Sequence, residues 1–401
     1  MTIFCICTFF KGSAFLEAAK HAGNRVYLLT DQKLATKPWP WESIDEVFYL
    51  DEVDNTFSTY QKLLDGVAHV MRDRKIDVVV ALDDFDVEKA ALVREHFRIP
   101  GMGQTTARYF RDKLAMRFRA QDQGLPVPPF SPLFTDIDIT EYLQTTHAPW
   151  VIKPRSEASA TGIRKVYSLE EAWEVIHSLG DNRHHFLIEQ FKPGHVFHVD
   201  SLSQNGHQLF SRCSQYLSTP FEVAHGGGIF RSVTVQEGSA EEAALLDLNA
   251  QVLAAFGLQL SASHTEIIQC HEDGQYYFLE TASRVGGAHL AEMVEASSGI
   301  NLWREWAYLE TAHAEGKPYI LPPVQPQYSG ILITLSSHEH PDYTPLQRPE
   351  IVWQMQEEYH VGVIVQSPDR QRVLDLLDEL AHQVHALGYH ASAPAPDKPT
   401  H

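Results

Sequence analysis

Two glutamates, Glu266 and Glu280, each lie next to a run of apolar residues, and a turn sequence separates them. Glu266 is followed by two isoleucines, Glu280 follows the run Tyr-Tyr-Phe-Leu, and an Asp-Gly pair between them indicates an antiparallel hairpin. Two carboxylates that face each other across strands repel unless a cation lies between them. Hard oxygen ligands suit Mg²⁺, which takes one or two protein carboxylates together with substrate phosphates. We predict a magnesium site here; the alternative is two solvated glutamates on the outer face of a hairpin.

An arginine follows the second glutamate by four residues. Arg284 carries a planar guanidinium whose donors match the oxygens of a phosphoryl group. In enzymes that transfer phosphoryl groups, such a cation stabilises charge on the equatorial oxygens. We predict that Arg284 holds a phosphoryl group during its transfer.

A lysine ends an apolar strand just before a segment of small residues. Lys153 closes the strand at residues 150–153, the small-residue segment spans 156–162, and Lys165 follows it. Small residues let backbone N–H groups approach an anion closely, and lysines supply point charges for phosphates. This predicts a phosphate-binding loop; a plain hairpin with exposed lysines fits the same pattern.

The strand at residues 186–191 changes abruptly from apolar to polar. It ends on Glu189, Gln190 and Phe191, before a Pro-Gly break. Such an element can offer backbone groups to an adenine edge and a side chain to a ribose. An ordinary strand end followed by a turn has the same pattern, so this indication is weak by itself.

The strands and helices that must position these residues follow different patterns in different parts of the chain. Apolar strands alternate with helical stretches over the first 100 residues, which is typical of a doubly wound parallel sheet. The first loop, at 9–13, lacks the GxGxxG pattern, which argues against an NAD site. A break at 99–103 marks a domain boundary. The further predicted helices span residues 106–123, 169–179, 240–256, 289–296, 302–314 and 370–387.

The order of these segments resembles the ATP-grasp superfamily, and the resemblance covers most of the chain. It is carried by Val-Ile-Lys-Pro at 151–154, Glu-Gln-Phe at 189–191, His-Thr-Glu at 264–266 and Leu-Glu-Thr-Ala-Ser-Arg at 279–284. The resemblance implies an α/β fold with three parts. They are an N-terminal Rossmann-like domain at 1–105, an ATP-grasp domain at 106–320 and a C-terminal lobe at 321–401.

The resemblance also implies roles for individual residues. Lys113, in an Arg-Asp-Lys triplet at a helix start, and Lys153 match the two nucleotide lysines of the superfamily. The hinge at 189–191 would meet adenine, and the following segment with His195 would supply a ribose contact. ATP and Mg²⁺ are the cofactors expected.

One position departs from the superfamily pattern. Ala282 occupies the place of an asparagine that helps to hold a second metal in many members. The branch with L-amino-acid ligases and carnosine-synthase-like enzymes resembles this chain in having alanine there. In that branch, a Glu-x-x-His segment contacts the substrate, which implies a substrate role for Glu222 and His225. We expect His225 and Arg284 to be catalytic, and Arg284 also to contact the substrate.

The resemblance therefore implies a ligase that joins a small-molecule carboxylate, an amino acid, to an amine through an acyl phosphate. Two alternatives stay open: a biotin-carboxylase-like activator of bicarbonate, and a non-catalytic nucleotide-binding protein. His225 and three following glycines also match the oxyanion turn of lipases, but the chain has no G-x-S-x-G, which disfavours an esterase.

Composition narrows the class of protein further. The 401 residues carry a formal net charge of −20, which disfavours nucleic-acid binding and requires a nucleotide site to be locally basic and metal-assisted. No apolar run approaches the roughly 20 residues that span a membrane. The four cysteines form no CxxC pair and fit a reducing compartment. We expect a cytoplasmic protein; whether it forms a homodimer is left open.

Overall fold

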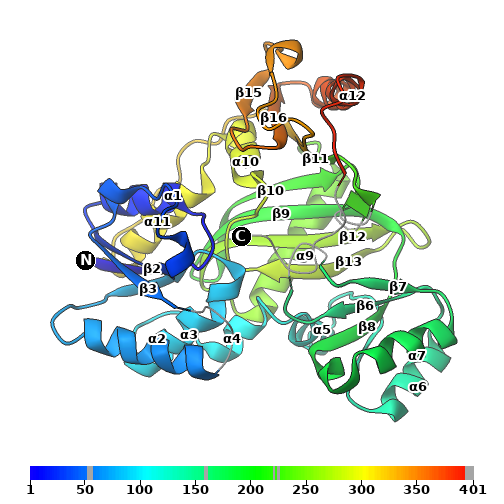
Figure 1. Cartoon of the computed structure of the whole chain (residues 1–401), viewed down its shortest axis with the longest axis horizontal. Helices are drawn as coiled ribbons and strands as arrows, with labels where there is room; N and C mark the ends of the chain where they lie inside the picture. Colours follow the sequence, from blue (N-terminus) through cyan, green and yellow to red (C-terminus); the bar gives the residue numbers. More distant parts are fainter. Residues whose placement is uncertain (52–56, 158–160, 220–221, 224–225, 393–401) are drawn as a thin grey trace.

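The computed structural model describes residues 1–51, 57–157, 161–219, 222–223 and 226–392. Its first 100 residues form a four-stranded parallel sheet in the order β3-β2-β1-β4, as the alternating pattern predicts (Figure 1). The edge strand β3 is not predicted, because only its last residue is fully buried. The elements are β1 (Thr2–Ile6), α1 (Ser13–His21), β2 (Arg25–Asp31), β3 (Glu46–Leu50), α2 (Phe57–Val70), β4 (Val78–Ala81) and α3 (Val87–Phe97).

The single helix predicted at 106–123 is wrong. The structure has two helices there, α4 (Gln104–Arg108) and α5 (Lys113–Asp122). Asp112 breaks the run, because its extended backbone and its carboxylate, which accepts from the N–H groups of Leu114 and Ala115, cap a new helix. The break places Lys113 at the first position of α5.

A small antiparallel sheet follows, in the order β5-β8-β6-β7. Two amphipathic helices, α6 and α7, pack against it through a common apolar core. The register pairs Val151 with Glu189, so the predicted phosphate strand and the predicted hinge are neighbours. The elements are β5 (Phe130–Pro132), α6 (Asp136–Thr145), β6 (Trp150–Pro154), β7 (Arg164–Val166), α7 (Leu169–Ser178) and β8 (Phe186–Gln190).

The largest element is an eight-stranded antiparallel sheet, in the order β13-β12-β9-β10-β11-β14-β16-β15. The last three of these strands come from the C-terminal region, so residues beyond 320 extend the sheet that carries the glutamate hairpin (Figure 1). The strands are β9 (Gly194–Gln204), β10 (His207–Tyr216), β11 (Phe230–Thr234), β12 (Leu260–Cys270), β13 (Tyr276–Ala282), β14 (Tyr328–Leu335), β15 (Ile351–Gln354) and β16 (His360–Ser367).

Four helices cover this sheet or link it to the N-terminal sheet. Apolar side chains of α9 pack against β9 and β13, and those of α12 pack against β14 and β16. The helices are α9 (Ala240–Phe256), α10 (Leu290–Ser298), α11 (Leu302–Ala314) and α12 (Arg370–Ala386). Short 3₁₀ helices are η1 (Gln32–Leu34), η2 (Trp41–Ser43), η3 (Asp84–Asp86), η4 (Gly180–His185) and η5 (Thr344–Leu346).

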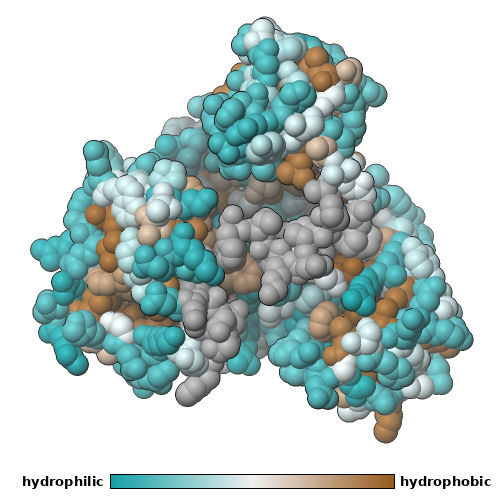
Figure 2. Space-filling view, in the orientation of Figure 1, coloured by the Kyte–Doolittle hydropathy of each residue, from teal (hydrophilic) through white to brown (hydrophobic). Residues whose placement is uncertain are grey.

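Apolar side chains are gathered in the interior. On the face shown in Figure 2, hydrophilic residues cover most of the surface and hydrophobic ones form small separate patches. The four cysteines are buried and unpaired, as expected for packed thiols. Within the described ranges, no helix is both long enough and apolar enough to cross a bilayer.

Helix α11 packs against α1 and carries a buried acid. The ring of Trp306 lies edge-on to Phe15, with 5.1 Å between centroids, and its Nε1 donates to Glu310 Oε1 at 2.9 Å. Burial raises the pKa of Glu310 to about 7, although Arg94 and the Trp306 hydrogen bond act in the opposite direction. The folded chain therefore keeps a proton on Glu310 that the unfolded chain releases near pH 4.5.

Replacing Glu310 with glutamine should remove a pH dependence of stability. A raised folded pKa gives stability that is complete below the unfolded pKa of 4.5 and is lost as pH rises through 7. The wild type should lose about 3 kcal/mol from this group between pH 4.5 and 8, and Glu310→Gln should not. Urea unfolding at pH 5 and pH 8 measures the difference. The exposed Glu17→Gln on α1 is the control, and equal slopes for both variants would contradict the account.

Candidate active site

Two cavities adjoin each other: the first lies between the small sheet and the large one, and the second lies between the large sheet and the region of Asp84 and Arg111. The first has a volume of about 530 Å³ and the second about 390 Å³. They share Lys113, Glu157, Glu266 and Glu280, and the second adds Arg284. The first is lined by most of the residues singled out from the sequence: Lys113, Lys153, Lys165, Glu189, Gln190, Phe191, Glu222, Glu266 and Glu280.

The two predicted metal glutamates are partners across β12 and β13. The register pairs Glu266 with Glu280, as the hairpin prediction requires. Lys113 Nζ lies 2.7 Å from Glu280 Oε2, and Tyr216 donates its hydroxyl to Glu266 Oε1 at 3.0 Å. Burial alone would raise the pKa of Glu280, but Lys113 holds that pKa below its usual value. A pair of ionised carboxylates beside lysines fits Mg²⁺ shared with phosphate oxygens.

The predicted phosphate lysine and hinge glutamate contact each other directly. Lys153 and Glu189 form a buried ion pair, and Arg117 Nε donates to Glu189 Oε2 at 3.0 Å. Burial alone would raise the pKa of Glu189, but Arg117 and Lys153 lower it; burial lowers the pKa of Lys153 to about 8 against the pull of Glu189. The carboxylate of Glu189 thus positions Lys153 in the cavity wall.

Arg117 is a site residue that sequence reasoning missed. Its side chain is fully buried on α5, and its Nη1 donates to the carbonyl of Leu279, the residue before Glu280. It therefore joins the hinge strand β8 to the metal strand β13. The sequence gives only a weak indication of its role, which is that an arginine lies on the apolar face of a helix.

Replacing Arg117 with methionine should destabilise the fold by about 3–5 kcal/mol, because it leaves Glu189 buried without one of its two cations. The carbonyl of Leu279 also loses its donor. Urea unfolding measures the change. Arg119→Met is the matched control, since Arg119 lies on the same helix, is half-buried and donates to the carbonyl of Ala255. A loss no larger than that of the control would contradict this role.

Two further predicted residues lie at the open side of the first cavity. Lys165 Nζ is 3.4 Å from the centroid of the Phe191 ring, within range of a cation–π contact. Glu222 is exposed, and its Oε2 accepts from both the backbone and the hydroxyl of Thr219. Burial lowers the pKa of Lys165, and the negative charge of Glu222 acts in the opposite direction. The two residues therefore lie near each other.

The structure does not bring His195 to the cavity wall. His195 is exposed, and its ring packs edge-on to His271, which does line the first cavity, with 4.7 Å between centroids. His225 and residues 158–160 of the small-residue segment lie outside the described residues. Glu157 and Thr161, on either side of that segment, line the first cavity.

Arg284 is held by an acid from the N-terminal sheet. Its Nε lies 2.9 Å from Asp84 Oδ2, and Asp84 starts η3, just after β4. Burial alone would raise the pKa of Asp84, but Arg284 and then Arg111 lower it. The N-terminal domain thus contributes a charged residue to the second cavity. Sequence reasoning missed Asp84, whose signal is an Asp-Asp pair after an apolar strand.

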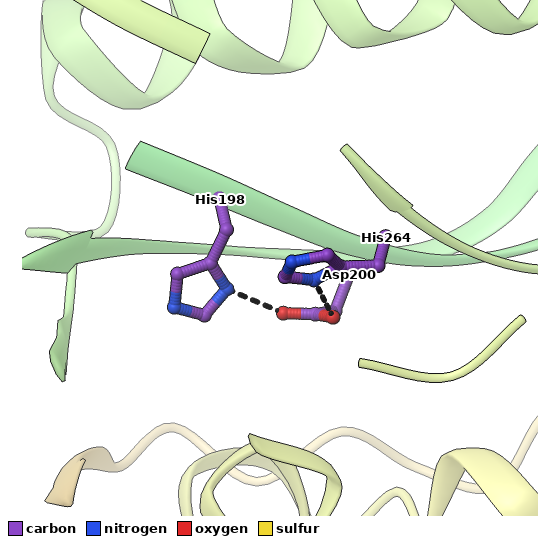
Figure 3. Close-up of side chains that lie close together, drawn as sticks. All are labelled: His198, Asp200 and His264. Atoms are coloured by element: carbon purple, nitrogen blue, oxygen red, sulfur yellow. Dashed lines mark hydrogen bonds and ion pairs between the residues drawn. The ribbon is translucent and has the colours of Figure 1, made fainter. Parts of the chain in front are cut away.

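A buried polar network lies behind Glu266. Figure 3 shows both imidazole rings turned toward Asp200: His198 Nδ1 lies 2.6 Å from one carboxylate oxygen and His264 Nδ1 lies 2.8 Å from the other. His198 Nε2 contacts Ser232 Oγ at 2.8 Å. These three residues lie close enough together to hold a metal ion, but three of their four ring nitrogens already have hydrogen-bond partners. We interpret them as a network that fixes β9 against β12.

This network extends to Glu266 on β12. His264 Nε2 lies 3.8 Å from Glu266 Oε1. Burial alone would lower the pKa of His264, but Asp200 raises it to about 9, so the ring is a cation at neutral pH. A Cβ on Gly286 would lie 2.8 Å from Asp200 Oδ1, which explains a glycine there. Ala282, the residue at the superfamily's asparagine position, is paired with His264 across the strands.

Known proteins share this architecture. No family model matches the chain. An L-arginine-specific L-amino acid ligase of Bacillus subtilis is 27% identical over 295 residues, which are 72% of this chain and 70% of that protein. The structure of an L-amino acid ligase from Bacillus licheniformis superimposes with a TM-score of 0.74 at 20% identity, over 97% of this chain and 98% of the other.

The chain has the ATP-grasp fold. A 2-oxoglutarate carboxylase biotin carboxylase domain of Hydrogenobacter thermophilus, in complex with MgADP, ADP and bicarbonate, has a TM-score of 0.69 at 15% identity over 97% of this chain and 90% of that one. The predicted fold class is confirmed, and the MgADP and ADP bound in this neighbour agree with the expectation of ATP and Mg²⁺ as cofactors. The roles of individual site residues stay predictions.

Proposed function

We propose that this ATP-grasp chain is an ADP-forming carboxylate–amine ligase that joins an amino acid to an amine through an acyl phosphate. The observation that carries the proposal is that Glu266 and Glu280 line both cavities. A carboxylate pair at such a junction can serve a nucleotide on one side and a substrate acid on the other. The sequence relationship to an L-amino acid ligase supports amino acids as substrates.

In this proposal, the first cavity binds ATP. Lys113, Lys153 and Lys165 neutralise its phosphates, which meets the need for a locally basic site in a chain with a net charge of −20. Adenine lies against the hinge at 189–191, whose residues line this cavity.

The second cavity takes the reacting groups. Glu266 and Glu280 would hold Mg²⁺, which would supply positive charge to the phosphate oxygens. A carboxylate oxygen of the first substrate forms a bond to the γ-phosphorus as the bond to ADP breaks, and Arg284 stabilises charge on the transferring group. The amine nitrogen then forms a bond to the carboxyl carbon, a proton is lost and phosphate leaves. Glu222, which lines the first cavity, and His225 remain the proposed substrate contacts.

Release of ADP from ATP and Mg²⁺ tests this function, with amino acids supplied singly and in pairs and with bicarbonate plus biotin as one arm. The proposal expects release that requires an amino acid and is fastest with a pair. Release in the bicarbonate arm alone would favour the carboxylase alternative. Bound ATP without turnover in any arm would favour a non-catalytic nucleotide-binding protein.

Three broader expectations stay predictions under this proposal. They are the domain boundaries at 105 and 320, the cytoplasmic location and small molecules, not nucleic acid, as partners, with the assembly left open. The boundary at 320 falls between α11 and β14, which lies in the same sheet as the glutamate hairpin. A lobe that starts there would complete the second cavity, since Ile333 on β14 lines it.

A further inference from the structure

Arg111 is a buried cation that faces the second cavity and has no acidic partner among the residues that the structure describes. Its side chain is 6% exposed, and it lies in the break between α4 and α5. The face of the Phe85 ring lies 4.2 Å from its guanidinium carbon. Its Nη2 is buried and has no hydrogen-bond partner, and no carboxylate within the described ranges lies in ion-pair distance of the group.

The other cations on this cavity all have acidic partners. Lys113 contacts Glu280, Arg284 contacts Asp84 and His264 contacts Asp200. Asp84 feels the charge of Arg111, but its Oδ2 is bound by Arg284. A buried guanidinium without hydrogen bonds is unfavourable unless an anion completes it. The second cavity therefore offers a site for one more anion.

The N–H groups of the Arg111 guanidinium that lack a hydrogen-bond partner in the described residues indicate which kind of anion would bind. A guanidinium fork binds a carboxylate or a phosphate through two parallel hydrogen bonds. In the proposed function, the lysines of the first cavity bind the phosphates of the nucleotide. Arg111 does not line that cavity. The carboxylate that is phosphorylated must lie between Glu266, Glu280 and Arg284. The ligand left for Arg111 is a carboxylate that takes no part in bond making.

We propose that Arg111 binds the α-carboxylate of the amine substrate, so that the second substrate is an α-amino acid and the product keeps a free carboxylate. This inference rests on the proposed ligase function. The amine nitrogen attacks the acyl phosphate, and its own carboxylate is unchanged in the product. Phe85 holds the guanidinium plane by stacking, which fixes the direction of approach. Arg111 is thus a specificity determinant for the acceptor.

The test separates acceptor binding from acid activation. Hydroxylamine traps the acyl phosphate as a hydroxamate, so it reports activation of the first amino acid without an acceptor carboxylate. Arg111→Gln should form hydroxamate at the wild-type rate while its KM for an acceptor amino acid rises roughly 10- to 100-fold. The wild type should prefer an amino acid to its amide as the acceptor, and the variant should lose that preference.

Two further variants define the outcome. Arg111→Lys keeps the charge but loses the fork, so its acceptor KM should lie between those of wild type and Arg111→Gln. Arg108→Gln is the matched control, because its side chain is 66% exposed on α4 and it does not line the cavity. Nucleotide binding and thermal unfolding show whether each variant is folded; if Arg111→Gln is not, Arg111→Lys decides.

Two results would overturn the assignment. An unchanged acceptor KM with normal hydroxamate formation would show that no acceptor carboxylate binds Arg111. A raised KM for the activated amino acid, with less hydroxamate, would place Arg111 on the other substrate. A wild type that forms no hydroxamate with any amino acid would instead overturn the ligase proposal, and this inference with it.

Discussion

Replacing Glu280 with glutamine should lower the rate of ADP formation about 1,000-fold, since the metal contributes several kcal/mol to stabilising charge in the transition state. Glutamine keeps the size of the side chain but removes one of the two charges paired across β12 and β13. It also removes the carboxylate charge that pairs with Lys113. ADP release at saturating ATP and Mg²⁺ measures the effect, and raising Mg²⁺ should restore only part of the rate.

The matched control for this substitution lies on the same hairpin. Glu272 is exposed in the turn between β12 and β13 and lines neither cavity. Glu272→Gln should therefore turn over at the wild-type rate. Turnover of Glu280→Gln within a few-fold of this control would show that the metal does not bind at the glutamate pair.

Replacing Arg284 with glutamine should lower turnover about 1,000-fold or more, the usual scale for an arginine that stabilises a transferring phosphoryl group. ATP affinity should change little, because Arg284 lines the second cavity and not the first. Arg284→Lys should not restore the rate, since an ammonium lacks the planar fork. Turnover and nucleotide binding, measured on the same preparations, separate the two effects.

The control for Arg284 is an exposed arginine on α11. Arg304 is 41% exposed on α11 and pairs with Glu295, so Arg304→Gln should behave as wild type. A variant of Arg284 that loses ATP affinity and turnover in proportion would show ground-state binding of the nucleotide instead. Such a result would also leave the pairing with Asp84 as the main role of Arg284.

The glutamate pair was predictable from the sequence because its geometry is local. The Asp-Gly turn places the two strands side by side, and a register shift between Glu266 and Ile267 then sets Glu266 opposite Glu280. The order of lysine, hinge and glutamates along the chain then indicated the fold. Helices α9 and α11 also agree with their predicted bounds, because each has a capping residue before an apolar repeat.

The missed residues all act over long distances in sequence. Asp84 binds Arg284 across 200 residues, and Arg117 binds Glu189 across 72. No local pattern reports such a pair, since each partner alone resembles a surface charge. The break before α5 was missed for another reason: Asp112 suits a helix interior poorly but a cap well, and its cap depends on the backbone turn that precedes it.

Transfer of oxygen from substrate to phosphate tests the central claim most directly. The amino acid activated by the chain is labelled with ¹⁸O in its carboxylate, and the phosphate released with ADP is examined by mass spectrometry. An acyl-phosphate route predicts one ¹⁸O atom in each phosphate, because the carboxylate oxygen that attacks the γ-phosphorus leaves with it. Phosphate without label, or release of AMP and pyrophosphate, would contradict the account.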